Sequence, residues 1–457
     1  MRKLIKIITL AVTMGILALT GCTTATAVSS IPEDMPIRNN PTPPVEISDI
    51  PEFYESTEPV WNRQDNEAVA VARGANDFAF RLSTALLENI EYENFVVSPY
   101  SVWLPLAALV NATNEEHRPA LLEALGAGNI TADDINRAAA RMLFDLTNEL
   151  LQQQQQEWDW LEESEFASSP LHIANAIFVD NDLTLQQEFA QTFLNYFRGE
   201  IMNIDFSSPE AVEFINQWAS NNTNGLINEL VQELDPDTVA AIANAIYFSG
   251  FWLNQFDPNN TSQDIFYSPK GESQAYFMEL EMFDWVYFED DYIQAVNLRF
   301  DTGGGMYIFL PVDGDAVGFL SSMTSEYFER IQENSVLAEG KLLLPRFSIE
   351  STIDSLEDAL IALGVPLFDS ASAPLTNGLV EEDILMWISD AIQVSMIEID
   401  EEGATAAAVT MFALAGSAPI PATTFEMICN TPFAFILHSP TQDGGSQILF
   451  MGVVNQL

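Results

Sequence analysis

Residues 398–421, EIDEEGATAAAVTMFALAGSAPIP, constrain the fold of this chain more than any other stretch. The segment begins as an acidic, strand-like sequence and continues through small or β-branched residues that carry no charge. Alanine repeats favour a helix, but Gly403 opens this one and Thr405, Val409 and Thr410 interrupt it. The pattern therefore predicts a segment that can adopt two conformations.

The rest of the chain is expected to form one large domain preceded by an export segment. At 457 residues with 48% hydrophobic content, the protein can bury a sizeable core. Beyond residue 66 neither a linker nor a repeat interrupts the pattern, so we expect a single domain over residues 67–457. A basic start, a short apolar run and small residues before Cys22 predict a secretory signal over residues 1–21.

The end of this signal, Leu19-Thr20-Gly21-Cys22, resembles the lipobox of bacterial lipoproteins. The resemblance implies cleavage before Cys22, lipidation of that cysteine, and anchoring on the outer side of a bacterial membrane, at the cell surface or in the periplasm, or extracellular after shedding. An ordinary signal peptide with a coincidental cysteine is the alternative. Residues 22–66 are rich in Pro, Ser and Thr, which predicts an extended spacer between domain and membrane.

The charge balance excludes some classes of partner. Of the 16 basic residues, Arg2, Lys3 and Lys6 leave with the signal, so 13 remain against 67 acidic residues. We therefore expect no nucleic-acid partner, and the acidity is typical of a solvated, exported protein. If Cys22 is lipidated, Cys429 lacks a disulfide partner and is expected to be a buried structural thiol.

The hydrophobic pattern predicts a mixture of helices and strands. Apolar residues at helical spacing predict helices over 68–88, 101–110 and 131–156, the last ending in five glutamines. Alternating or continuous apolar runs predict strands over 171–179, 201–206, 240–248, 295–300, 306–310, 341–347, 425–429, 433–438 and 447–454. Helices first, then strands intermixed with helices, indicate the α+β class.

Familiar catalytic patterns do not occur in the sequence. His117, His172 and His438 each lack a second histidine at ligand spacing, and there is no HExxH, GxSxG or phosphate-binding glycine loop. Gly303-Gly304-Gly305 lies between two predicted strands, where a hairpin turn is its usual meaning. We therefore expect neither an enzyme nor a bound metal or cofactor. A hydrolase with a hidden Ser-His-Asp set has no feature in its favour.

Ten motifs, in a fixed order from about residue 70 to the end, resemble the serpin family. They are NFVVSPYSVWLPLAAL, LHIANAIFVD, FRGEIMNIDF, INQWASNNTNGLINELV, AIANAIYFSGFWLNQFDP, LLLPRFSIE, LGVPLFD, EIDEEGATAAAVT, NTPFAFIL and ILFMGVVN. The resemblance implies three β-sheets with about nine helices and an exposed reactive centre loop. In serpins a protease attacks this loop, and the cleaved loop enters the main sheet as a new strand while the protease is still held as an acyl ester.

A loop with this role must be able to enter a packed sheet. The resemblance assigns the hinge to Glu401 and Glu402, which would end the preceding strand, and to Gly403, where the backbone would bend. The strand to be inserted would carry small residues on both faces: Ala404, Ala406, Ala408 and Thr410 on one, and Thr405, Ala407 and Val409 on the other. Neither face has bulk, charge or proline, which favours an inhibitor over a non-inhibitory relative.

The scissile bond is placed by counting. In most serpins it lies fourteen residues after the hinge glycine, which gives Ser417-Ala418, with a shift of one or two residues, to Gly416 or Ala418, left open. All these residues are small, and no Lys or Arg lies between Gly403 and Pro432. The target is therefore expected to be an elastase-like or subtilisin-like serine protease rather than a trypsin-like one. A papain-like cysteine protease is the lesser alternative.

The resemblance also implies where the main sheet opens. The matching positions are Ser98, Ser101, Asn244, Trp252 and Gln393. Gln393 replaces a histidine that the family usually has; an amide can donate and accept as imidazole does, but the rate and pH dependence of opening need not be those of the family. Thr431, Ala434 and the lack of a common proline at residues 298–300 are further departures.

The sequence thus predicts a monomeric, irreversible inhibitor, anchored by lipid, that traps a serine protease as a covalent acyl complex. The alternative is a non-inhibitory surface protein of the serpin fold that binds ligands or partners. Hinge composition favours the first.

Overall fold

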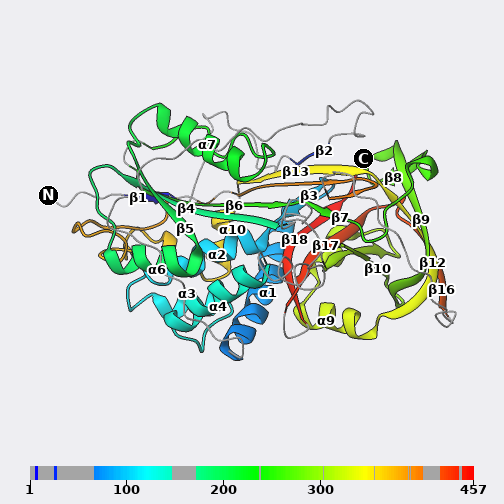
Figure 1. Cartoon of the computed structure of the whole chain (residues 1–457), viewed down its shortest axis with the longest axis horizontal. Coiled ribbons are helices and arrows are strands. Elements are labelled where there is room, and N and C mark those ends of the chain that lie inside the picture. The colour runs from blue at the N-terminus through cyan, green and yellow to red at the C-terminus, as the bar shows by residue number, and fades with distance from the viewer. Residues whose placement is uncertain are drawn as a thin grey trace, which may run out of the picture.

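The computed structural model describes residues 66–146, 171–235, 238–301, 303–354, 356–389, 391, 393–404, 423–441 and 445–457, and two short strands near the N-terminus. Within these ranges nine α-helices and three β-sheets confirm the α+β class (Figure 1). The helices are α1 (Asn66–Leu87), α2 (Pro99–Leu109), α3 (Arg118–Ala124), α4 (Ala132–Phe144), α6 (Gln187–Phe197), α7 (Glu210–Asn222), α8 (Ala316–Ser321), α9 (Ser325–Asn334) and α10 (Leu356–Ala362). None of the helices in the described ranges is long and apolar enough to cross a bilayer.

The largest sheet has nine strands, in the order β16-β12-β9-β10-β11-β17-β18-β3, with β8 paired to β9. Its strands are β3 (Phe95–Val97), β8 (Ser262–Ser268), β9 (Gly271–Glu289), β10 (Ile293–Arg299), β11 (Gly305–Pro311), β12 (Val336–Pro345), β16 (Thr423–Ile428), β17 (Phe433–Pro440) and β18 (Ser446–Val454). Almost every residue of β17 and β18 is buried, as their continuous apolar sequence predicted. The glycines before β11 form the predicted turn, with Gly303 at φ 91° and Gly304 at φ 73°.

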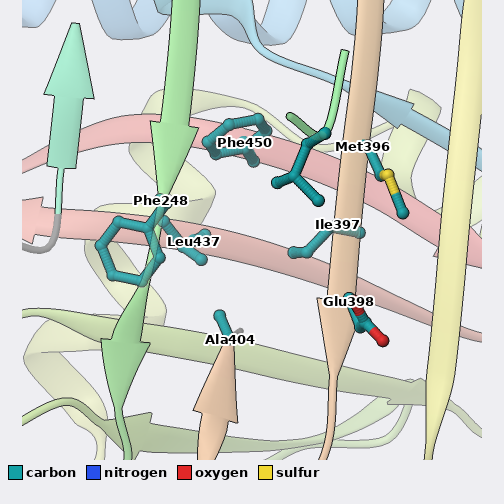
Figure 2. Close-up of a pocket in the computed structure, with 8 residues that line it drawn as sticks. Phe248, Met396, Ile397, Glu398, Ala404, Leu437 and Phe450 are labelled. Atoms are coloured by element: carbon teal, nitrogen blue, oxygen red, sulfur yellow. The ribbon is translucent and has the colours of Figure 1, made fainter. Parts of the chain in front are cut away.

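The two smaller sheets lie edge to edge. One has the order β1-β6-β4-β5, and the other β2-β13-β14-β15-β7. Their strands are β1 (Lys6–Ile8), β2 (Ala25–Ala27), β4 (Leu171–Asp180), β5 (Gly199–Ile204), β6 (Thr238–Phe248), β7 (Gly250–Phe251), β13 (Phe347–Ile353), β14 (Gln393–Ile399) and β15 (Gly403–Ala404). In Figure 2, β6 and β14 run side by side with β15 entering between them at one end. This space between β6 and β14, hereafter the slot, positions the candidate site.

Helix α2 lies beneath the slot, and its sequence explains where it begins. Ser98 is the N-cap, with extended backbone and a side chain that accepts a hydrogen bond from the Ser101 N–H, and Pro99 follows at the first helical position. All eleven residues of the helix are buried. A helix that is apolar all round must lie inside the protein. Helix α2 is therefore a buried support beneath β6 and β14.

The strand predicted over residues 341–347 was wrong as a single element. The chain forms two strands, β12 and β13, with Arg346 between them. At Arg346 the chain changes its pairing partner: the Arg346 N–H still donates to Tyr276 O of β9 (2.9 Å), whereas Phe347 pairs with Ile399 of β14. The side chain of Arg346 turns toward the slot's entrance. The 19-residue strand β9 was not predicted, because acidic residues on its exposed face hide the alternation. The glutamines at 152–156 lie outside the described residues.

Candidate functional site

The hinge segment folds into a tight turn at the end of β14. The Asp400 carboxylate accepts hydrogen bonds from the backbone N–H groups of Glu402 (2.9 Å) and Gly403 (3.1 Å), and the Asp400 N–H donates to Gly403 O (3.1 Å). An aspartate that bonds its own backbone two residues ahead is a common way to build a turn. The chain therefore reverses over Asp400–Glu402, and Gly403 and Ala404 run back antiparallel to β14 as strand β15.

Gly403 lies inside the strand rather than at the pivot of the turn. It pairs with Phe251 and Ala404 pairs with Gly250, both in β7. A Cβ atom at position 403 would stand 2.0 Å from Gly250 O and 2.9 Å from Phe251 Cα. The glycine is thus needed for the close approach of β7, whereas the sequence had suggested backbone freedom as the reason.

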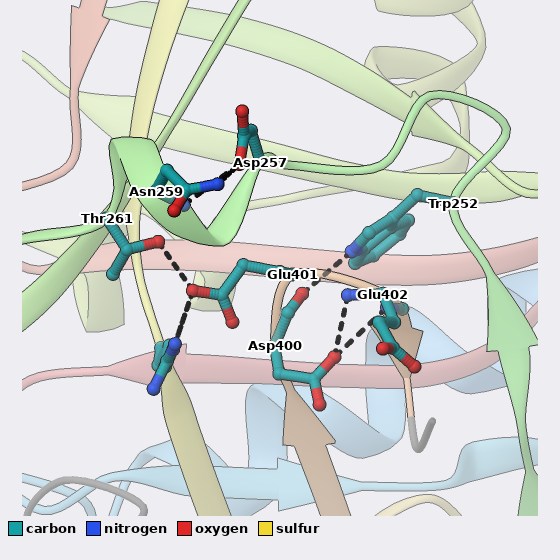
Figure 3. Close-up of polar contacts among 9 residues, drawn as sticks. Trp252, Asp257, Asn259, Thr261, Asp400, Glu401 and Glu402 are labelled. Carbon is teal, nitrogen blue, oxygen red and sulfur yellow. Dashed lines mark hydrogen bonds and ion pairs between the residues drawn. The ribbon is translucent and has the colours of Figure 1, made fainter. Parts of the chain in front are cut away.

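Glu401 ties the turn to the body of the protein. Its side chain is 7% exposed, and the carboxylate accepts from Nε of Arg346 at 2.9 Å, from Nη2 of Arg346 at 2.5 Å, and from the Thr261 hydroxyl (Figure 3). The backbone of Glu401 accepts a further bond from the Phe256 N–H (3.0 Å). All three side-chain bonds converge on Oε1 of Glu401, and charge-assisted hydrogen bonds of this kind anchor a buried carboxylate strongly.

The carboxylates on either side of Glu401 lie in a less favourable setting. Burial raises the pKa of Asp400, and the charge of Glu401 raises it further, although the two backbone N–H groups and Arg346 act in the opposite direction. Burial also raises the pKa of Glu402, with added repulsion from Asp400 and Glu401. Arg346 offsets the charge of Glu401 and part of that of Asp400, so the three adjacent carboxylates of the ionised turn are held together at an electrostatic cost.

Trp252 covers the turn from the other side. Its Nε1–H donates to Asp400 O (3.0 Å), and its backbone N–H donates to Glu402 O (2.9 Å). The indole is buried and stacks on Phe300, with ring centroids 4.8 Å apart and planes 11° from parallel. The tryptophan predicted near the loop entrance therefore contacts the turn directly, by its ring and its backbone (Figure 3).

Gln393 clamps the start of β14 to the N-terminus of α2. Its Oε1 accepts from the Ser98 N–H at 3.1 Å, while its Nε2–H donates to Ser98 O at 2.7 Å. Gln393 is 6% exposed and Ser98 is fully buried. The amide thus uses both the donor and the acceptor capacity that the sequence suggested could substitute for imidazole.

The other strand bordering the slot is bound to the same helix. The Ser101 hydroxyl donates to the Asn244 Oδ1 of β6, and the Asn244 Nδ2–H donates to Asn175 Oδ1 (2.8 Å) of β4. Asn175 and Asn244 are direct cross-strand partners, and Asn175 in turn donates to Phe197 O (2.8 Å). One helix end therefore holds both edges of the slot through neutral side chains.

Unfilled space lies along the slot. A cavity of about 50 Å³ is lined by α2 and by residues of both facing strands, including Asn244 and Gln393. A smaller cavity of about 10 Å³ adjoins Ala404, between Phe248 and the Met396–Glu398 segment (Figure 2). Figure 2 shows Ala404 at the end of β15, directed along the gap between β6 and β14.

The remaining predicted site residues lie outside the described residues. These are the hinge positions Thr405, Ala406, Ala407, Ala408, Val409 and Thr410, the candidate bond residues Gly416, Ser417 and Ala418, and the lipidation site Cys22. The structure brings Glu401, Glu402, Gly403, Ala404 and Trp252 together at one end of the slot. It brings Ser98, Ser101, Asn244 and Gln393 together further along it.

Comparison with known proteins identifies the family. The sequence model of the family described as "Serpin (serine protease inhibitor)" matches residues 73–457. The chain belongs to the serpin family. It is 30% identical to antichymotrypsin-2 of Bombyx mori, over 85% of this chain and 98% of that protein, and 30% identical to antitrypsin of the same species, over 81% and 92%. The crystal structure of the thermophilic serpin tengpin in its native state superposes with a TM-score of 0.72 at 24% identity, covering 88% of this chain and 97% of tengpin.

Sequence reasoning missed two residues that shape this serpin's hinge. Arg346 and Asp400 were not singled out, although Arg346 is a lone cation within the apolar motif LLLPRFSIE of a very acidic chain. A cation in such a setting needs a partner, and that requirement could have indicated an ion pair. Cys429 is fully buried, as expected, and burial raises the pKa of its thiol well above the usual range.

Proposed function

We propose that this serpin is an irreversible suicide-substrate inhibitor of elastase-like or subtilisin-like serine proteases. The observation that carries the proposal is strand β15: Gly403 and Ala404 already occupy a strand position between β14 and β7. The chain continues from there into the uncharged segment 405–410. Insertion would therefore extend a strand that has already begun, without a separate nucleation step.

The chemistry belongs to the protease. Its serine Oγ attacks the carbonyl carbon of Ser417, the bond to Ala418 breaks, and the amine of Ala418 leaves with a proton. Residue 417 is then held as an acyl ester. If the loop enters the slot before water hydrolyses that ester, the protease is carried along and its active site is distorted.

Insertion is favourable because the slot can satisfy both the backbone and the side chains of the loop. Each added residue can bond to the facing edges of β6 and β14, and each such bond contributes about 0.5–1.5 kcal/mol. Ala404 is 2% exposed, so the alternation of a strand would bury Ala406, Ala408 and Thr410 on the same face. Export would remove β1, which pairs with β6, together with the signal segment.

The test mixes the mature protein with elastase-like, subtilisin-like, trypsin-like and papain-like proteases, followed by denaturing gels and mass spectrometry. We expect a covalent complex with the first two classes and release of a peptide that begins at Ala418. Clean cleavage without a complex would instead indicate the non-inhibitory alternative. A complex with the papain-like enzyme alone would reassign the target class.

A matched pair of variants separates insertion from protease recognition. Ala406→Glu places a carboxylate on the face to be buried, so the variant should become a substrate that is cleaved without trapping. Ala422→Glu makes the same change on the other side of the scissile bond, in a segment that does not insert, and should still trap.

We further propose that Cys22 is lipidated and that the 22–66 spacer carries the serpin domain away from the outer face of a bacterial membrane. The Leu-Thr-Gly-Cys sequence supports this proposal. Labelling with a palmitate analogue should mark the wild-type protein and not Cys22→Ala, which should also leave the membrane fraction. Equal labelling of both would favour an ordinary signal peptide.

A further inference from the structure

An exposed apolar pair lies at the end of the molecule formed by β9, β12 and β16 (Figure 1, right). Phe283 of β9 is 67% exposed and Leu337 of β12 is 62% exposed. Single exposed apolar residues are common, but two large ones on adjacent strands of a sheet are typical of a contact surface.

A bulge in β9 turns Phe283 outward. Ala338 pairs with Trp285 and Gly340 pairs with Met282, so Phe283 and Asp284 together stand opposite the single residue Glu339. Bulges re-aim side chains, and here both residues of the bulge are exposed. The exposure of Phe283 therefore results from a defined backbone feature.

The inner face of the same strands is rigidly packed. Phe425 of β16 stacks on Tyr287 with ring centroids 4.1 Å apart, and the Trp285 Nε1–H donates to Gly340 O (2.9 Å). Trp285 and Tyr287 are buried. Phe283 and Leu337 are consequently presented on a firm support, which lowers the entropy lost on binding.

Carboxylates lie on the same strands as the apolar pair and on the neighbouring strand β16. Glu281, Asp284 and Glu339 belong to β9 and β12, and Glu426 lies on β16. Lys341 forms ion pairs with Glu279 (3.2 Å) and Glu426 (3.7 Å), and Arg299 pairs with Asp284 (2.9 Å). The five carboxylates outnumber the two cations, so a basic partner is favoured.

Chain length fixes how far this surface can be from the proposed scissile bond. Ala418 precedes Thr423 by five residues, which span at most about 18 Å when fully extended. Thr423 begins β16 and pairs with Ala338, the neighbour of Leu337. A protease domain of ordinary size has a radius of gyration of about 17 Å. A protease bound at residues 417–418 therefore reaches this surface.

We propose that Phe283, Leu337 and the carboxylates on these strands form a second contact surface for the target protease, which selects a protease with a basic, partly apolar rim beside its active site. The inference rests on the proposed inhibitory function, since it takes the occupant of the loop as its partner. Phe283 supplies an aromatic anchor of the kind that dominates protein interfaces, and the carboxylates accelerate encounter with a basic partner.

The test compares the mature wild-type protein with Phe283→Ala/Leu337→Ala and with Glu281→Gln/Glu339→Gln. Two elastase-like proteases are used, one basic and one acidic in isoelectric point. Association rate constants and the stoichiometry of inhibition are measured at low and high salt. In a separate experiment, binding is measured to each protease with its catalytic serine replaced by alanine. Ile361→Ala on α10, another exposed aliphatic residue, is the control matched to Leu337→Ala.

With the basic protease, the apolar double variant should associate about tenfold more slowly at unchanged stoichiometry. The glutamine variant should lose most of the salt dependence. The acidic protease and Ile361→Ala should show little change. Equal rates for wild type and both double variants with the basic protease would overturn the second surface and leave the inhibitory mechanism standing. If the wild type traps no protease, the inhibitory function fails, but binding to the basic protease with its catalytic serine replaced still tests the surface. Tight binding by the wild type that is weaker for Phe283→Ala/Leu337→Ala supports the surface, and no binding overturns it.

Discussion

The hinge turn and the clamp at the N-terminus of α2 hold the two ends of the same slot by different chemistry. At the hinge, Glu401 pairs with Arg346, and burial raises the pKa values of Asp400 and Glu402. At the clamp, Gln393, Ser98, Ser101 and Asn244 form a network without a titrating group. The contacts at the hinge involve charged groups, and those at the clamp involve only neutral ones.

This difference predicts that the two ends of the slot respond differently to solution conditions. Charged groups respond to pH and salt, whereas amide and hydroxyl bonds do not titrate in the physiological range. Entry of the loop should therefore depend on solution conditions, while separation of β6 from β14 at the clamp should not. A histidine in place of Gln393, as the family usually has, would make both ends sensitive to pH.

The largest expected effect comes from breaking the ion pair of the hinge. Glu401→Ala leaves Arg346, whose side chain is only 19% exposed, without the carboxylate it pairs with, which should lower the free energy of unfolding by about 3–5 kcal/mol. Denaturant unfolding followed by tryptophan fluorescence measures the change. Arg299→Ala, which removes the exposed pair with Asp284, should cost less than about 1 kcal/mol. Equal effects of the two substitutions would contradict the anchoring role of Glu401.

Gln393→Leu tests the neutral clamp. It keeps the side chain's approximate volume but leaves the Ser98 N–H and C=O without the amide partner, so we expect a loss of about 2 kcal/mol. Because the clamp holds β14 to α2, insertion should also become faster, which stopped-flow mixing with a target protease would detect. Gln294→Leu, at a half-buried position on β10, is the control.

Gln393→His should convert the neutral clamp into a titrating one. Burial disfavours imidazolium, so the native state would bind fewer protons than the unfolded state below about pH 6.5. Stability should then fall by about 1 kcal/mol between pH 8 and pH 5.5 relative to wild type. Denaturant midpoints at the two pH values measure this loss of stability. An equal change in midpoint for variant and wild type would argue against the buried setting of residue 393.

The smallest effect is expected for Asp400→Asn. Because the pKa of Asp400 is raised in the native state, the native protein binds more protons than the unfolded chain, and its stability falls as pH rises from about 4 through that raised pKa. Asparagine can build the same turn without a charge. The variant should therefore equal wild type in acid and exceed it by less than about 1 kcal/mol at neutral pH. A variant less stable than wild type at neutral pH would show that the charge of Asp400 supports the turn.

Parts of this site could be read from sequence because they depend on local chemistry. Ser98-Pro99 predicted the start of α2, and the run of glycines predicted the turn before β11, since capping and positive φ involve neighbouring residues. The motifs also pointed to Trp252 and Gln393 as residues near the opening of the sheet. Strand 341–347 failed because an apolar run cannot reveal that the chain changes its pairing partner at Arg346, from β9 to β14.

The sequence by itself determined the class of protein, the small uncharged residues that follow Ala404, and the residue types available at each end of the slot. Only the tertiary structure decided that Gly403 is required by the approach of β7 and that Gln393 grips the backbone of Ser98, 295 residues away. It also decided that a bulge in β9 exposes Phe283. These features depend on which strands become neighbours, and contacts between distant segments leave no periodic signal in either segment alone.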